Sequence, residues 1–566
     1  MMGETSASFN LVDRAWIVVR MLDGSRKVLS IREVFHLAES VQCPANDIAT
    51  QDFAILRLLI AVLQRAVIIR INEGDFDEDV LPADVWGELW KEGLPLKDID
   101  AYLDAWHDRF DLLDAEQPFM QVADLASTKG EVSDLKKILI DVPDGLPLFS
   151  LKSGEGLKSL SLAEAARCLV TVHAFDTSGI KTGVVGDPSV KGGKSYPIGT
   201  GWAGSIGGVY LEGNNLAETL LLNLILCSNW CPQDDFTEFV ADDDLPAWEQ
   251  PQKTPGDDGR KPSGSADLYS WQSRRVKLFA EDDEVVGVVL SNGDKIEPHL
   301  CASLEPMTCW RRSQNQEKKL GIHPVYLPTH LQKGKAIWRG LASLLPEFHT
   351  SGDEERRAPG VTLWAGHLAS LEGGRVLPAN YKVRIHSTGF EYGVQSSVVS
   401  EMIDDAMTLS VFLMSGDGKD CARQAEKCMT KTDEAVFKAL GGLAVNLRLA
   451  AGDEVDRARG DRERVMAEAY FELDAPFRSW LVSLGPDTDL TSAEAEWYAQ
   501  ARSILSNVAR QLIDEAGPDA VVGRKVKQGK REEWMNAGQA QRWFQFQLRK
   551  CLSTVEENEE REGKKV

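Results

Sequence analysis

The clearest pattern in the chain is an apolar stripe at helical spacing in residues 50–67. Its members recur at intervals of three or four residues and are Phe53, Leu56, Ile60, Leu63 and Val67. This spacing predicts an α-helix with one face in the core, and Thr50 suits its N-cap. Upstream, residues 9–29 predict two strands joined by an Asp-Gly turn, and Ser30 with Glu33 forms a capping box that begins a short helix.

The pattern changes twice further along the chain. Residues 274–280 and 284–296 are rich in β-branched residues and are bounded by an acidic turn and an Asn-Gly dipeptide, so they predict strands. From 397 onward the apolar positions predict helices, beginning with a seam at Val399, Met402, Ala406, Leu409 and Leu413. We therefore expect an α+β fold, with a large mixed domain at 1–396 that carries Gly-rich loops and a C-terminal four-helix bundle at 397–566.

Two segments interrupt this organisation. Residues 177–208, TSGIKTGVVGDPSVKGGKSYPIGTGWAGSIGG, hold too many glycines for a regular helix or a long strand, so they predict a loop held by its surroundings. Residues 241–265 combine four prolines with many charges. That composition is typical of a solvated insertion outside the core.

The charge balance argues against a protein that binds DNA through bulk charge. There are 63 Lys and Arg residues against 87 Asp and Glu residues, for a formal net charge of −24. Positive charge is concentrated locally in residues 307–321, MTCWRRSQNQEKKLG, where Arg311, Arg312, Lys318 and Lys319 are candidate phosphate contacts. The alternative is an amphipathic strand or hairpin with Trp310 buried and the arginines in water.

The Gly-rich segment also carries lysines that could meet phosphate oxygens, namely Lys181, Lys191 and Lys194. Its alternative is a solvated loop without a ligand. Within it, PSVKGGKS resembles the end of a P-loop, but Pro188 replaces the first glycine, and the sequence after Ser195 cannot begin the helix that a P-loop requires. A P-loop nucleotide hydrolase is kept as the alternative function.

The sequence contains no clear motif for a metal site, a cofactor or a membrane segment. The cysteines form no CxxC pair and the histidines no HxxxH or HExxH pair, so we predict no metal and no cofactor. The longest apolar run, residues 54–70, is interrupted by Arg57, Gln64 and Arg65, and the N-terminus has no signal-peptide pattern. We expect a cytoplasmic protein with no membrane partner.

Five stretches in order carry a resemblance to a known family. They are FNLVDRAWIVVR, TQDFAILRLLIAVLQRA, EQPFMQ, LYSWQSRRVKL and EPMTCWRRSQNQEKKLG. Together with the Gly-rich loop and the helical C-terminus, they resemble CasA, the large subunit of the type I-E CRISPR complex Cascade. The resemblance implies a non-catalytic subunit that recognises the protospacer-adjacent motif (PAM) of double-stranded DNA from the minor groove, helps start strand separation and docks a helicase-nuclease. The implied partners are the other Cascade subunits, the guide RNA, target DNA and that nuclease.

The resemblance also implies site residues. An assembly loop falls at 145–156 with Phe149 as its aromatic contact, and the glycine loop at Gly183 and Gly186, with Gly192 and Gly193 as alternatives. A lysine that enters the minor groove matches Lys295, in the expected Asn-Gly hairpin. A glutamine wedge that enters the duplex matches Gln395, flanked by Val394 and Ser396. Without the resemblance, Gln395 is a polar residue in a turn.

Overall fold

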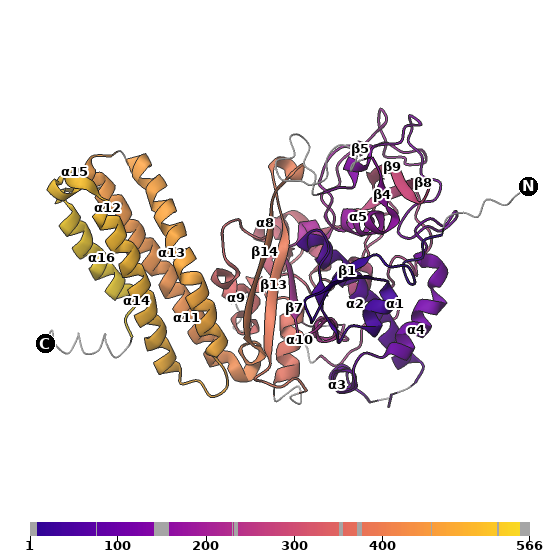
Figure 1. Ribbon diagram of the computed structural model, residues 1–566, viewed down its shortest axis with the longest axis horizontal. Coiled ribbons are helices and arrows are strands. Elements are labelled where there is room, and N and C mark those ends of the chain that lie inside the picture. The colour runs from indigo at the N-terminus through magenta and orange to yellow at the C-terminus, as the bar shows by residue number, and fades with distance from the viewer. Residues whose placement is uncertain are drawn as a thin grey trace, which may run out of the picture. The chain divides into compact units, whose positions relative to one another are not determined.

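The computed structural model describes residues 8–74, 76–77, 79–140, 158–228, 230, 236–349, 355–370, 376–453, 455–528 and 531–554 (Figure 1). The chain divides into two compact units. Unit 1 comprises Met1–Lys333, Phe348–Leu377 and Val383–Ala406, and unit 2 comprises Gly334–Glu347, Pro378–Lys382 and Met407–Val566. Helices and sheets are both present, so the predicted α+β class is confirmed. The domain boundary at 396/397 stays a prediction.

The N-terminal part of unit 1 follows its local signals. Strand β1 (Ile17–Met21) pairs antiparallel with β2 (Arg26–Leu29) and with β3 (Val41–Pro44). The hydroxyl of Ser30 accepts from the Glu33 amide and the Glu33 carboxylate accepts from the Ser30 amide, which begins α1 (Ile31–His36). The predicted hairpin and capping box are therefore confirmed.

Helix α2 (Ala49–Asn72) is the centre of unit 1. It packs against α4 (Leu96–Ala105), α5 (Leu162–Phe175), α6 (Leu216–Leu222) and α7 (Ser265–Tyr269), so its buried positions extend all round rather than along one stripe. It begins after Ile48, and Thr50 lies buried inside it instead of capping it. The polar interruptions are core residues with partners, because the Arg57 guanidinium donates to the buried Glu305 carboxylate at 2.7 and 2.9 Å. None of the helices that the structure describes has the length and apolar character of a membrane span.

Strands β8 (Arg274–Glu281) and β9 (Glu284–Asn292) form an antiparallel hairpin, and β4 (Leu160–Ser161) pairs with β9. The hairpin turn lies at Asp282 and Asp283, which have φ values of 49° and 62°. The expected Asn-Gly hairpin is wrong. Gly293 lies beside the residues just before β8, and its amide donates to the Ser273 carbonyl at 3.0 Å. A side chain at position 293 would collide with the Gln272 carbonyl.

Two further three-stranded sheets are present. Strands β11 (Tyr326–Pro328), β10 (Trp310–Arg312) and β12 (Arg356–Arg357) form one, and β14 (Val399–Ser410), β13 (Lys382–Tyr392) and β7 (Gly208–Glu212) form the other, in these orders. The helical seam expected from Val399 is therefore wrong. In β14 the more buried positions alternate with exposed ones, as in a strand with one covered face, and β13 supplies the backbone partner that a local pattern cannot reveal.

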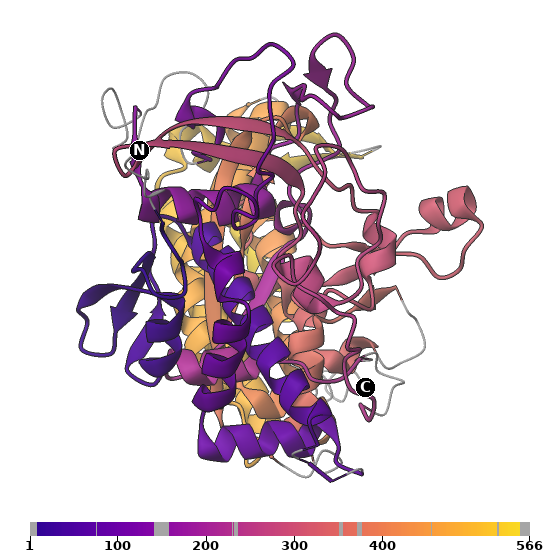
Figure 2. The ribbon, with the colours of Figure 1, turned by 90° about the vertical axis from the view of Figure 1, so that its right-hand side faces the viewer.

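Further short elements belong to unit 1. Their bounds are α3 (Pro82–Glu92), β5 (Lys181–Thr182), β6 (Lys194–Ser195), α8 (Gln314–Leu320) and α10 (Gly360–Ala369). Figure 2 shows α8 at its right-hand edge, standing out from the rest of unit 1.

The segment 241–265 is not the solvated insertion that its composition predicts. Trp248 is buried against Phe110 and Phe119, with ring centroids 5.0 and 6.2 Å away. The Asp244 carboxylate is also buried and accepts from two backbone amides of α7. The segment therefore contributes buried residues to the core, where charged groups such as Asp244 have partners elsewhere in the chain, while residues 257–259 stay exposed.

Unit 2 is mainly helical. Helix α11 (Lys419–Ala435) continues through a π-helical stretch, η11 (Val436–Leu440), into α12 (Gly441–Ala451), followed by α13 (Val455–Ser483), α14 (Leu490–Asp514), α15 (Gly517–Val522) and α16 (Ala537–Cys551). Helix α9 (Leu341–Leu344) also lies here, and β15 (Arg524–Gln528) pairs with β16 (Arg531–Met535). Helix α12 packs on α13 and α16, and α14 packs on α11 and α13. The buried centre includes Trp497, whose ring lies 4.9 Å from that of Phe477.

Candidate nucleic-acid interface

The glycines of residues 177–208, the Gly-rich segment, make tight backbone turns. Strands β5 and β6 pair with each other, and Gly192 and Gly193 close the turn between Lys191 and Lys194 with φ values of 60° and 72°. A two-residue turn with positive φ at both positions favours glycine. The P-loop alternative is wrong, because the residues after Gly193 form β6 and then a loop where a phosphate-binding helix would begin.

Gly183 and Gly186, the expected glycine loop, lie where backbone comes close to other residues. The Gly183 amide donates to the Gly193 carbonyl at 3.1 Å, and a Cβ on Gly183 would stand 2.5 Å from that carbonyl carbon. Gly186 has a φ of +87° and lies beside Pro255. A side chain at either position would therefore strain the segment.

The three lysines of this segment differ in their surroundings. Lys191 and Lys194 are exposed. Lys181 is not available to a phosphate, because its Nζ lies 2.6 Å from the buried Asp176 carboxylate and its side chain is only 11% exposed. Burial lowers the pKa of Lys181 below its ordinary value, against the opposing effect of Asp176.

Lys295 follows the end of β9 and is half exposed. Its Nζ lies 2.6 Å from Glu297, whose carboxylate is also exposed, so water screens this ion pair. The residue before it, Asp294, is buried. The backbone of Lys295 is therefore anchored while its charged end faces solvent.

Gln395 lies at the tip of the β13–β14 hairpin, which we define as residues 393–398. Gln395 and Ser396 have φ values of 56° and 54°, and the side chain of Val394 is 83% exposed. The Gly393 amide donates to the Val398 carbonyl at 2.9 Å and closes the tip. The Ser178 amide donates to the Ser396 carbonyl at 2.9 Å, so the tip and the Gly-rich segment lie together.

The basic stretch at 310–319 divides into paired and exposed residues. Arg311, Lys318 and Lys319 are exposed, whereas Trp310 is buried. The Arg312 guanidinium donates to the buried Glu317 carboxylate at 2.6 Å, and chiefly this hydrogen bond lowers the pKa of Glu317 to about 2. Arg312 is thus part of the local fold.

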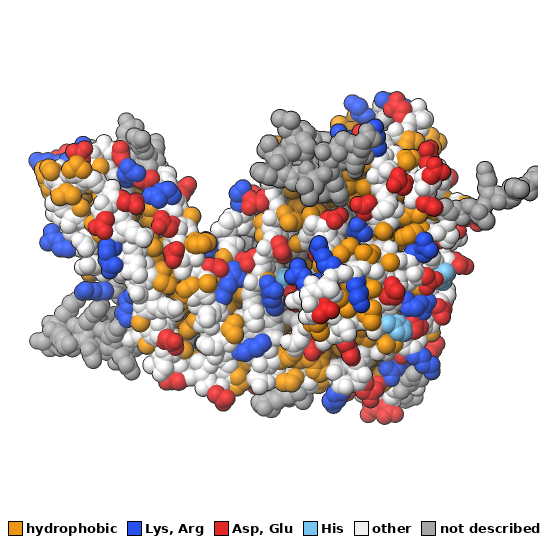
Figure 3. Space-filling view, viewed as in Figure 1, with side chains coloured by type: hydrophobic (Ala, Val, Ile, Leu, Met, Phe, Trp, Pro, Cys, Tyr) orange, Lys and Arg blue, Asp and Glu red, His pale blue; other side chains and the backbone are white. Residues whose placement is uncertain are grey.

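The face drawn in Figure 3 agrees with the idea of local positive patches on an acidic chain. Lys and Arg side chains gather in the middle of unit 1, over the region where Figure 1 places β1, β7 and β13, with acidic side chains around them. Phe149 lies outside the described residues. Among the described residues, no group of three or more His, Cys, Asp or Glu side chains is arranged to hold a metal ion.

Sequence reasoning missed two consecutive buried arginines on β8. The Nε of Arg274 donates to the Asp176 carboxylate at 2.5 Å, and the Nη2 of Arg275 donates to the Asp294 carboxylate at the same distance. All four side chains are buried. The signal was present, because two arginines at the start of an apolar strand point to opposite faces and each needs a buried partner.

The comparisons with known proteins agree on one family. The family model described as CRISPR-associated protein Cse1 matches residues 10–508. The chain belongs to this family. CasA/Cse1 of Thermus thermophilus is 28% identical to this chain over 470 residues, which cover 80% of each sequence. The resemblance to CasA of type I-E Cascade is therefore confirmed.

Solved structures show the same similarity. Cse1 of Thermobifida fusca is 39% identical with a TM-score of 0.83, and the match covers 96% of this chain and 98% of that one. Cse1 of Acidimicrobium ferrooxidans is 29% identical with a TM-score of 0.77, covering 97% and 98%. A chain of a CRISPR RNA-guided surveillance complex, 16% identical with a TM-score of 0.64 and covering 90% and 99%, shares the fold.

Proposed function

We propose that this chain is the non-catalytic large subunit of an RNA-guided antiviral CRISPR complex. In this role it recognises the PAM in double-stranded DNA, helps start strand separation and offers a docking surface to the helicase-nuclease. Membership of the Cse1 family supports the role of a CRISPR surveillance subunit. The other Cascade subunits and the guide RNA are its proposed partners, with the loop around Phe149 as the assembly contact and the long helices of unit 2 as a four-helix bundle.

The observation that carries the proposal is the hydrogen bond between the Gly-rich segment and the tip of the β13–β14 hairpin. It attaches the segment that carries Gly183 and Gly186, the proposed PAM-contacting glycines, to the turn that carries Gln395. Glycine loops allow a backbone to approach a groove closely, and an exposed side chain on a closed turn can enter a duplex. These two features support a PAM-reading loop beside a wedge.

The charge distribution fits this role. A subunit with a net charge of −24 does not hold DNA by bulk attraction, but it can use local contacts when guide RNA pairing supplies sequence specificity. The proposed base-proximal contacts are Lys295 and Gln395, with Val394 and Ser396 beside the latter. The proposed phosphate contacts are Lys191, Lys194, Arg311, Lys318 and Lys319, with Arg312 mainly structural because Glu317 occupies it.

The wedge is tested by Gln395→Ala in the reconstituted complex. Unstacking a base step costs a few kcal/mol, so loss of the wedge should slow opening of the first target base pairs by about tenfold on a fully paired duplex. Assembly and initial PAM contact should stay unchanged. A target with a mismatch bubble next to the PAM should restore the rate, which a fluorescent base at the first target position measures.

Gln117→Ala is the matched control, because Gln117 is also an exposed glutamine of unit 1. It should open both targets at the wild-type rate. If Gln395→Ala is impaired equally on paired and bubbled targets, Gln395 is an ordinary turn residue and the wedge assignment fails.

A further inference from the structure

The three proposed DNA-contacting elements come from distant parts of the sequence. They are the Gly-rich segment, Lys295 after β9, and the tip that carries Gln395. The first two each begin directly after a buried carboxylate that is paired at the start of β8, and the hairpin that carries the tip is hydrogen-bonded to residues on either side of the first of these carboxylates.

The first anchor is Asp176, which follows the last residue of α5. Its carboxylate binds the Nε of Arg274 at 2.5 Å and the Nζ of Lys181 at 2.6 Å. The Nη2 of Arg274 also donates to the carbonyls of Thr177 at 3.1 Å and Gly199 at 2.9 Å, which lie in the first and last parts of the Gly-rich segment. Asp176 and Arg274 therefore close this segment at its base.

The same corner holds the β13–β14 hairpin. The hydroxyl of Tyr392, just before the tip, donates to the Phe175 carbonyl at 2.6 Å. The Ser178 amide donates to the Ser396 carbonyl at 2.9 Å. A side chain on Gly204 would collide with the Tyr392 ring, so the Gly-rich segment also packs directly on the hairpin. The wedge and the glycine loop thus share one attachment at the end of α5.

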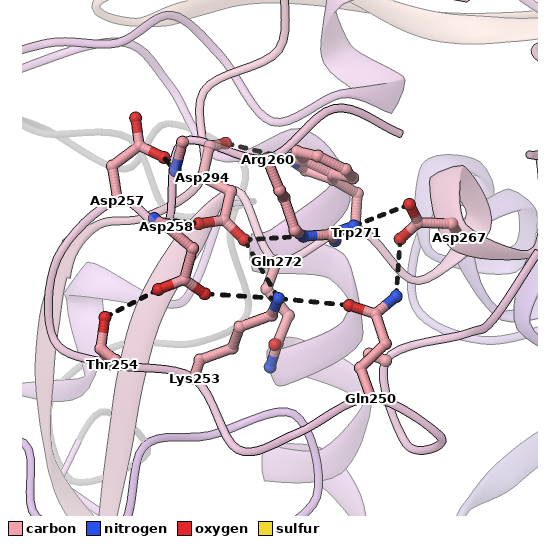
Figure 4. A network of polar contacts seen from close by, with 12 residues as sticks. Gln250, Lys253, Thr254, Asp257, Asp258, Arg260, Asp267, Trp271, Gln272 and Asp294 are labelled. Carbon is pink, nitrogen blue, oxygen red and sulfur yellow. Dashed lines mark hydrogen bonds and ion pairs between the residues drawn. The ribbon is translucent and has the colours of Figure 1, made fainter. Parts of the chain in front are cut away.

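The second anchor is Asp294, directly before Lys295 (Figure 4). Its carboxylate is surrounded by cations, with Arg275 at 2.5 Å, Arg260 at 3.2 Å and Lys253 at 3.5 Å. Burial raises the pKa of Asp294, but Arg275 and the other donors outweigh this effect and bring the pKa below its ordinary value. Asp294 therefore stays ionised, and this holds the backbone on which Lys295 stands.

Arg274 and Arg275 join the two anchors, because consecutive strand residues point to opposite faces. We propose that Asp176, Arg274, Arg275 and Asp294 are positioning residues that fix the Gly-rich segment, Lys295 and the Gln395 tip in one arrangement before DNA binds. This inference rests on the proposed function. A site that reads a groove must be held to a fraction of an ångström, and buried ion pairs with defined partners can specify one conformation.

The test uses variants at the edge of the network, since loss of a central charge could unfold unit 1. Lys181→Met keeps the alkyl stem but removes the ion pair to Asp176, and Lys181→Arg restores a cation. Tyr392→Phe removes the hydrogen bond to Phe175. Lys136→Met is the matched control, because it removes an exposed lysine of unit 1 that has no part in this arrangement.

Each variant is assembled with guide RNA and the other subunits. Its affinity is measured for duplexes that share one protospacer and differ only in the flanking PAM. Wild type and Lys136→Met should discriminate among the PAMs equally. Lys181→Met and Tyr392→Phe should each lower the ratio between the best and the poorest PAM by about threefold to tenfold, as expected for one lost buried contact. Lys181→Arg should recover most of the ratio, and the double variant should lose less than the product of the single losses.

Two kinds of failure are distinguishable. If the wild-type complex binds all PAM variants equally, the proposed function is wrong. If wild type discriminates but Lys181→Met and Tyr392→Phe behave like Lys136→Met, the positioning role is overturned. A uniform loss of affinity for all PAMs, with the ratio unchanged, also overturns it, because that result indicates a general loss of folded protein.

Discussion

Residues 241–265 and 310–319 are both rich in charge, but the structure uses them in different ways. In the first segment, Lys253 and Arg260 point inward to Asp294, as Figure 4 shows. In the second, Arg311, Lys318 and Lys319 face solvent, and Arg312 is held by Glu317. The two segments differ in their ion-pair partners. Asp294 and Asp267 lie outside the first segment, and their carboxylates neutralise Lys253 and Arg260.

The comparison teaches that a run of charges predicts exposure only when no buried partner exists elsewhere in the chain. Ionised groups can enter a core when they are paired and hydrogen-bonded. Trp248 in the first segment already indicated burial in the sequence, since a large aromatic residue is seldom left in water. In the structure its indole donates to the Tyr102 hydroxyl at 2.7 Å. Trp310 in the second segment is also buried, although Arg311 beside it is exposed. An aromatic residue therefore predicts its own burial but not the burial of its neighbours.

The largest expected effect is in the buried network. Asp294→Ala leaves Arg275 buried without its carboxylate, and breaking such a pair costs about 3–5 kcal/mol. Thermal unfolding should show a marked loss of stability in unit 1. Asp257→Ala, which removes an exposed carboxylate of the same network, should change stability by less than about 0.5 kcal/mol. Equal small losses in both variants would mean that 241–265 behaves as a surface segment after all.

An intermediate effect concerns pH and the basic stretch. The pKa of Glu317 falls from 4.5 to about 2 in the folded chain, chiefly through Arg312. The folded pKa lies below the unfolded one, so this group stabilises the fold above pH 4.5, and that contribution disappears as the pH falls towards 2. Glu317→Gln should therefore flatten the loss of stability over this window, measured by acid unfolding followed through tryptophan fluorescence. An unchanged acid limb would show that the Arg312 pair contributes nothing.

The smallest expected effect on stability comes from the exposed cations. Replacing Arg311, Lys318 and Lys319 together by Ala should change unfolding free energy by no more than about 1 kcal/mol, because none is buried. In the assembled complex the same variant should weaken binding of all PAM duplexes equally and reduce the salt dependence of affinity. Arg312→Ala should do the reverse, with lower stability and a nearly unchanged salt dependence. A loss confined to one PAM would instead indicate base recognition.

Features that depend on neighbouring residues could be predicted from the sequence alone. The hairpin at β1 and β2, the capping box at Ser30, the long helix α2 and the helices of unit 2 all depend on contacts within a few residues of one another. Order and spacing of matching stretches also indicated the family. These signals are local in the chain, so they can be interpreted before the chain is folded.

The positions of the charged side chains and of the ambiguous segments depend instead on contacts between distant parts of the chain. The apolar spacing at 399–413 favoured a helix, but the structure pairs this segment with β13 as a strand. The sequence left Lys181 available to a phosphate, but in the structure its side chain is largely buried in an ion pair with Asp176. Asp176 and Arg274 lie 98 residues apart, so no local pattern pairs them. A buried ion pair is favourable only when folding brings both partners together and excludes water from them. The arrangement around Gln395 and Lys295 therefore depends on contacts between residues that are far apart in the sequence.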